Sequence, residues 1–159
     1  MSSIKKKSLR WYFFRAPVYL YRWGLGGLLS RRVLLLKHTG RRSGRQRETV
    51  LEVVQYRKEI PEVFVVAGFG RDSDWLLNVQ AQPRVEVTIG WRRFSACARF
   101  PDLPEALEVI RDYEQRNRFI APIIRYGFSR LLGWQYHNTD ADRRRLVEQL
   151  PVVAFRGCS

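Results

Sequence analysis

A short basic segment between two apolar runs contains the residues best suited to chemistry. Its glycines, serine and arginines are Gly40, Arg41, Arg42, Ser43, Gly44, Arg45 and Arg47. Glycine lets the backbone take positive φ and approach a ligand closely, and neighbouring N–H groups can form a concavity that binds anions. Arginine grips phosphate or carboxylate oxygens through paired N–H donors. The segment predicts a turn that holds an anionic group of a cofactor, with a solvated hairpin tip as the alternative.

The positive charge of the chain is confined to its first third. The 159 residues have a formal net charge of +14, and residues 1–47 contain thirteen Lys or Arg and no Asp or Glu. The remainder has sixteen basic and fifteen acidic residues. A one-sided basic region needs an anionic partner, such as a cofactor phosphate, a nucleic acid or lipid headgroups. Nucleic acid is disfavoured, because the motifs described below explain the charge more economically.

Length and composition indicate a single domain over residues 1–159 with a real core, since 45% of the residues are hydrophobic and 13% aromatic. No apolar run approaches the roughly 20 residues needed to span a bilayer, and the basic start lacks the smooth apolar segment of a signal peptide. We therefore expect a cytoplasmic protein. The two cysteines and two histidines lack the spacing of a metal site.

The elements that must position the turn are mostly short strands. Apolar runs and alternation predict strands over residues 33–38, 48–56, 62–67, 84–89, 91–100 and 151–156. Helices are expected over residues 74–81, 102–117, 119–135 and 140–150, with the third interrupted at Pro122, Gly127 and Gly133. Ser73 or Asp72 is expected to cap the first, and Asp102 with Glu105 resembles a capping box. This order predicts an α+β fold, a mainly antiparallel barrel with flanking helices.

Residues 1–30 form a basic aromatic segment that is expected to be helical. Aromatic and apolar residues recur at three- and four-residue spacing, with arginines between them. Two interpretations stay open and can coexist. The helix packs across an open side of the domain, or it lies in an anionic membrane surface and makes the protein peripheral at the inner face of the membrane.

Four motifs in the middle of the chain resemble those of a known family. They are Thr39-Gly-Arg-Arg-Ser-Gly-x-x-Arg47, Ala67-Gly-Phe-Gly70, Asp74-Trp-Leu-Leu-Asn78 and Ala81-Gln-Pro83. Together they resemble the deazaflavin-dependent nitroreductase family, over roughly residues 33–113. The resemblance implies a split β-barrel and binding of coenzyme F420, a deazaflavin with a phosphate and an acidic oligoglutamate tail. It also implies hydride transfer from the reduced deazaflavin to an organic acceptor such as a quinone, nitro or enone compound.

The resemblance also implies roles for individual residues. The phosphate and tail would be bound by Arg41, Arg42, Ser43, Gly44 and Arg47. The deazaflavin ring would be lined by Thr49, Val50, Leu51, Ala67, Gly68 and Phe69. Trp75 and Asn78, one helical turn apart, would close the cofactor site, and Arg71 would replace a lysine that some members have in the loop. No catalytic side chain is expected, because the cofactor provides the chemistry.

The acceptor pocket is expected at Glu52, Tyr126 and Tyr136. Glu52 is equally well explained as a structural partner of an arginine, and the two tyrosines as packing residues. Two rival functions also stay open: an FMN-binding split-barrel protein, and a non-catalytic carrier of a cofactor or fatty-acyl ligand. The sequence leaves the acceptor undetermined, and the protein is expected to be a monomer or a homodimer.

Overall fold

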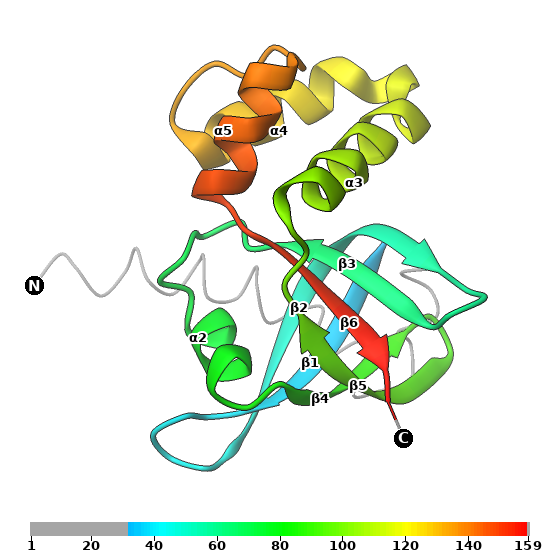
Figure 1. Ribbon diagram of the computed structural model, residues 1–159, viewed down its shortest axis with the longest axis vertical. Coiled ribbons are helices and arrows are strands. Elements are labelled where there is room, and N and C mark those ends of the chain that lie inside the picture. Colours follow the sequence, from blue (N-terminus) through cyan, green and yellow to red (C-terminus); the bar gives the residue numbers. More distant parts are fainter. Residues whose placement is uncertain (1–31, 159) are drawn as a thin grey trace, which may run out of the picture.

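The computed structural model of the protein describes residues 32–158, and strands from both ends of that range close into one barrel (Figure 1). The strands are β1 (Val33–Thr39), β2 (Gln46–Arg57), β3 (Glu62–Val66), β4 (Arg84–Ile89), β5 (Arg92–Arg99) and β6 (Val152–Gly157). Their spatial order is β1-β2-β3-β6-β5-β4, every neighbouring pair is antiparallel, and pairing of β1 with β4 completes the circle. The helix expected over residues 1–30 lies outside the described residues.

The barrel interior follows from residues that alternate along the strands. Leu34 and Leu36 of β1 and Val85 and Val87 of β4 are buried in one hydrophobic cluster. The alternation continues to His38, which is also buried. Since successive side chains point to opposite faces of a strand, the apolar inner row of β1 ends in a polar residue at the end of the barrel nearest the β1–β2 turn.

The helices lie in two places (Figure 1). Helix α2 (Asp74–Ala81) connects β3 to β4, while α3 (Leu103–Arg116), the 3-10 turn η2 (Arg118–Ile120), α4 (Ala121–Leu132) and α5 (Asp140–Gln149) all lie between β5 and β6. The α3, α4 and α5 helices gather over one side of the barrel and form a second hydrophobic cluster with Phe64 and Val54. The expected α+β class, a mainly antiparallel split barrel with flanking helices, is therefore confirmed.

Three local predictions need correction. Ser73 occupies the N-cap of α2 but forms no cap, because its hydroxyl donates to the Gly70 carbonyl at 2.7 Å. Asp102 does cap α3 by accepting from the Glu105 N–H at 3.0 Å, whereas the Glu105 carboxylate binds Arg99 instead of completing a capping box. Gly127 does not interrupt α4, which ends at Gly133 in the left-handed conformation. In the described part of the chain, no helix combines the length and apolar character needed to cross a bilayer.

Candidate cofactor site

The β1–β2 turn has a backbone that needs its two glycines. Gly40 N–H donates to the Arg45 carbonyl at 2.8 Å, and Gly44 N–H donates to the Gly40 carbonyl at 2.9 Å. Gly44 has a φ of +67°, which L side chains rarely adopt. A Cβ at Gly40 would lie 2.7 Å from the Ser43 hydroxyl oxygen. The two glycines thus allow a tight fold of the turn that places the intervening arginines.

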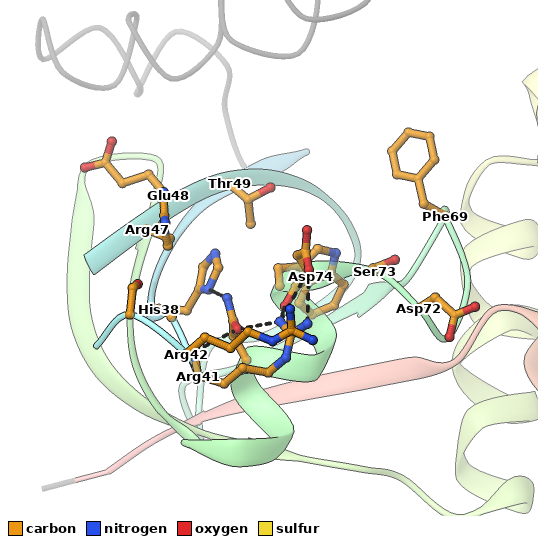
Figure 2. Close-up of a pocket in the computed structure, with 14 residues that line it drawn as sticks. His38, Arg41, Arg42, Arg47, Glu48, Thr49, Phe69, Asp72, Ser73 and Asp74 are labelled. Atoms are coloured by element: carbon orange, nitrogen blue, oxygen red, sulfur yellow. Dashed lines mark hydrogen bonds and ion pairs between the residues drawn. The ribbon is translucent and has the colours of Figure 1, made fainter. Parts of the chain in front are cut away.

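Arg41 clamps this turn onto α2. Its backbone N–H donates to Asn78 Oδ1 at 3.0 Å, and its Nη1 donates to the same oxygen at 2.9 Å. Its Nη2 also lies 3.3 Å from Asp74 Oδ1. Figure 2 shows Arg41 and Asp74 joined in this way beside α2. Arg41 therefore holds the turn in place, and its guanidinium is already engaged by the protein.

The Asn78 amide also fixes the tautomer of His38, whose ring is uncharged. Because Asn78 Oδ1 accepts from Arg41, the Asn78 Nδ2 group faces His38 and donates to His38 Nδ1 at 3.1 Å. The proton of the neutral ring consequently lies on Nε2. Burial, and then the positive charge of Arg47, lower the pKa of His38 to about 4, while Asp74 opposes them. His38 is thus an uncharged donor on the cavity wall at neutral pH.

A cavity of about 740 Å³ opens between the β1–β2 turn, the end of the barrel and the start of α2 (Figure 2). Its lining includes eight of the predicted site residues: Arg41, Arg42, Ser43, Arg47, Thr49, Phe69, Trp75 and Asn78. Trp75 is 8% exposed and packs against Phe155 in the barrel core, with ring centroids 6.3 Å apart. One wall is therefore aromatic and rigid, and the opposite rim is basic.

The basic rim retains unused hydrogen-bond donors. Among residues 32–158, the guanidinium groups of Arg42 and Arg47 form no ion pair, and the backbone N–H groups of Arg42 and Ser43 have no acceptor. Consecutive free N–H groups beside guanidinium groups are typical of sites that bind phosphate or carboxylate. This arrangement fits an elongated ligand that has an anionic end and an aromatic ring.

Comparison with known proteins gives the family of the chain. Residues 15–117 match the family described as F420H(2)-dependent quinone reductase, a match over more than half of the sequence. The chain belongs to this family. It is an F420-dependent reductase, and its cofactor is coenzyme F420. The kinship expected from the four motifs is confirmed.

Solved structures with the same fold support the split-barrel architecture. An F420-H2 dependent reductase (FDR-A) has 21% sequence identity and a TM-score of 0.53, covering 79% of this chain and 95% of its own. A structure described as a domain-swapped dimer has 19% sequence identity and a TM-score of 0.53, and the match covers 87% of this chain and 98% of the other. A Listeria innocua protein named after pyridoxamine 5'-phosphate oxidase has 12% sequence identity and a TM-score of 0.51, and the match covers 88% of this chain and 94% of the other. These likenesses show the fold alone. No curated protein matches the chain.

Six residues predicted to contact F420 do not line the cavity. Gly44 lies in the turn, and Val50 points to the opposite face of β2 from Thr49. Leu51 and Ala67 are buried in the barrel core. The site of a Cβ on Gly68 would be 3.6 Å from a methyl carbon of Leu131. Arg71 donates to the Glu148 carbonyl of α5 at 2.8 and 3.0 Å, so its guanidinium holds the loop after β3 against the helices.

The three residues predicted for the acceptor pocket are dispersed. Glu52 Oε1 accepts from the Tyr113 hydroxyl at 2.8 Å, and within residues 32–158 its carboxylate forms no ion pair with an arginine. Tyr126 is 66% exposed on α4. Tyr136 is buried among the helices, where its hydroxyl donates to Glu114, and burial raises its pKa above the ordinary value. None of the three lines the cavity beside the turn.

The cavity also contains Gly40 of the predicted turn, and the structure adds five residues that the sequence interpretation missed: His38, Glu48, Asp72, Ser73 and Asp74. His38 could have been found from alternation, because it continues the inner row of Leu34 and Leu36. Asp74 is the partner of Arg41, a contact between segments 33 residues apart. No pattern in the sequence indicates that pairing.

Proposed function

We propose that this reductase transfers a hydride from reduced F420 to a quinone-type acceptor, and that Arg42 and Arg47 hold the phosphate and acidic tail of the cofactor. One observation supports the proposal above all. Arg42 and Arg47 line the cavity without an ion-pair partner in residues 32–158, while their neighbour Arg41 is engaged by α2. Guanidinium groups without an ion-pair partner, at the rim of a cavity with an aromatic wall, suit a ligand that joins an anionic tail to a planar ring.

The chain's own residues would bind and orient the cofactor. When bound, reduced F420 supplies the hydride. Trp75 and Thr49 form a wall that can support the ring, and Phe69, 63% exposed at the rim, can shield it from water. His38 can donate its Nε2–H to a ligand oxygen without bringing a charge to the ring. The protein thereby positions the reactants and excludes water, and no nucleophile is required.

The binding proposal is tested by titrating F420 and FMN into the purified protein and, in parallel, into the Arg42→Ala and Arg47→Ala variants. Each lost charge-assisted contact is worth roughly 1.5–3 kcal/mol, so each variant should bind F420 about 10–100-fold more weakly. Arg45→Ala is the matched control, since Arg45 is exposed on the same turn but does not line the cavity. An equal loss in the control, or tighter binding of FMN than of F420, would contradict the proposal.

The acceptor class is tested by turnover. Reduced F420 is mixed with the protein and with quinone, nitroaromatic or enone compounds, and its oxidation is followed by absorbance. The proposal requires a quinone to be reduced faster than the other classes. If none of these compounds oxidises reduced F420 in the presence of the protein, the result would favour a non-catalytic carrier.

We further propose a cytoplasmic protein that residues 1–30 bring to an anionic membrane surface. The proposal comes from the aromatic and basic composition of this segment. Co-sedimentation with liposomes compares the full chain with a form that lacks residues 1–30, and equal partitioning would discard the idea. A monomer or homodimer remains the prediction for the oligomeric state.

A further inference from the structure

Within residues 32–158, helix α4 has one packed apolar face and further apolar side chains that are exposed. Ile124, Phe128 and Leu132 are buried against the other helices. Elsewhere on α4 and on the preceding turn η2 lies a set of exposed apolar residues that we call the α4 stripe: Phe119 (87% exposed), Ile123 (67%), Tyr126 (66%), Leu131 (46%) and Ile120 (38%). An apolar patch of this kind on a protein surface marks an interaction site.

The middle of the α4 stripe follows the helical repeat. Ile123 and Tyr126 are spaced by three residues, and Ile120 of η2 precedes them at the same spacing, so the three lie along neighbouring positions of one exposed side. Leu131 is five residues beyond Tyr126 and lies at the edge of this side, next to the buried Phe128. The exposed side that carries Ile123 and Tyr126 is therefore about two helical turns long, with Leu131 at its border.

The α4 stripe lies in a segment of the chain whose charged residues have one sign. Residues 117–139 contain Arg118, Arg125 and Arg130 but no Asp or Glu. All three arginines are exposed, and none forms an ion pair within residues 32–158. The Arg118 guanidinium lies over the Phe119 ring at 5.1 Å from its centroid. Apolar side chains beside unpaired arginines match the interface of an anionic lipid bilayer, where acyl chains lie beneath negative headgroups.

The α4 stripe also reaches the rim of the F420 cavity. Leu131 lies next to Gly68, since a Cβ there would be 3.6 Å from a Leu131 methyl carbon. The following residue, Phe69, lines the cavity, and Figure 2 shows its ring standing clear of the loop after β3. Exposed apolar side chains thus lead from α4 to the opening of the cavity.

We propose that the α4 stripe docks on an anionic lipid bilayer, with Arg118, Arg125 and Arg130 contacting the headgroups. Docking would bring the cavity rim at Phe69 close to the membrane surface. An acceptor dissolved in the lipid would then reach the cofactor with a short passage through water, a consequence that rests on the proposed function. The docking itself does not depend on the proposed function, because vesicle binding is measured without F420 or an acceptor.

The test uses the full chain and vesicles of phosphatidylcholine with or without phosphatidylglycerol. The Ile123→Ser/Tyr126→Ser variant should partition onto anionic vesicles at least tenfold more weakly than the parent. Arg125→Gln/Arg130→Gln should lose the preference for anionic over neutral vesicles. Trp91→Ser is the matched control, because Trp91 is 77% exposed but lies between β4 and β5, and it should partition as the parent does. F420 titration verifies that each variant is folded.

Hydrogen exchange locates the contact on the unmodified protein. Addition of anionic vesicles should slow amide exchange in peptides that cover residues 117–132. Slowing confined to residues 1–31, or equal partitioning of the parent and Ile123→Ser/Tyr126→Ser, would overturn the proposal. So would a homodimer that the same variant converts into monomers while vesicle partitioning stays unchanged, since the stripe would then bind a second copy of the chain.

Discussion

His38 is the residue at which the barrel core meets the proposed cofactor site. It occupies an inward position on β1, where an apolar residue would otherwise continue the row of Leu34 and Leu36. Among residues 32–158, its side chain forms one hydrogen bond, with the Asn78 amide, which fixes the ring and its tautomer. A buried imidazole next to Arg47 resists protonation, so this position places a donor at the cavity without a charge.

The lowered pKa of His38 predicts a loss of stability in mild acid. The pKa is about 4 in the folded protein and 6.5 in the reference state, so the unfolded chain takes up the proton first as the pH falls. The contribution of His38 to the free energy of unfolding is therefore constant above about pH 6.5, declines between about pH 6.5 and 4, and amounts to at most about 3 kcal/mol.

Urea denaturation of the parent and of His38→Asn between pH 4.5 and 7.5 measures this contribution. The asparagine oxygen can accept from Asn78 in place of Nδ1 but does not titrate. The free energy of unfolding of the variant should fall less steeply on acidification than that of the parent. Parallel pH profiles would show that His38 is protonated in the folded state as readily as in the unfolded chain.

At the scale of elements, the site depends on how α2 is joined to the β1–β2 turn. Asn78 is 5% exposed and uses one amide for three contacts, with the backbone and side chain of Arg41 and with His38. The turn extends beyond the barrel, and the clamp restricts its position. The clamp thereby positions the next residue, Arg42, at the cavity, while pairing of β2 with β1 positions Arg47 there.

Asn78→Ala should therefore weaken both folding and cofactor binding. It leaves the Arg41 N–H and His38 Nδ1 without a partner, which costs about 1–3 kcal/mol of unfolding free energy for each buried unsatisfied group. F420 affinity should fall as well, although Asn78 is not expected to carry the charge that binds the tail. Denaturant titration and F420 titration measure the two effects. Gln80→Ala, at an exposed position of the same helix, should change neither.

The sequence predicted elements more reliably than the contacts between them. Alternating Val85, Val87 and Ile89 and the capped start at Asp102 are local signals, and the strand and helix they predicted are present. The engagement of Arg41 by Asp74, of Arg71 by the Glu148 carbonyl and of Tyr136 by Glu114 joins segments 22–77 residues apart. A cluster of arginines predicts an anion site, but only the fold decides which of them remain available.

At the scale of the whole molecule, a buried carboxylate joins the barrel to the helical layer. Glu62 of β3 is fully buried and lies 2.7 Å from Arg99 at the end of β5 and 3.2 Å from Arg156 of β6. Arg99 also binds Glu105 of α3 at 2.7 Å. These bonds raise the pKa of Arg99 and lower that of Glu105, with the pair between Arg99 and Glu105 as the main favourable cause. Arg57 of β2 also lies 3.6 Å from Glu62 and 3.9 Å from Glu105. One network thus connects four strands to α3.

The depth of Glu62 predicts a large effect of its removal. Glu62→Ala leaves the partly exposed guanidinium groups of Arg99 and Arg156 without their buried partner, which should lower the free energy of unfolding by about 1–3 kcal/mol. Glu105→Ala removes a partner that is 25% exposed and should cost no more than about 1 kcal/mol. None of the residues that line the cavity beside the β1–β2 turn belongs to the network. Glu62→Ala should consequently bind F420 with parental affinity while it remains folded, and a loss of affinity at low denaturant would show that the two ends of the barrel are coupled.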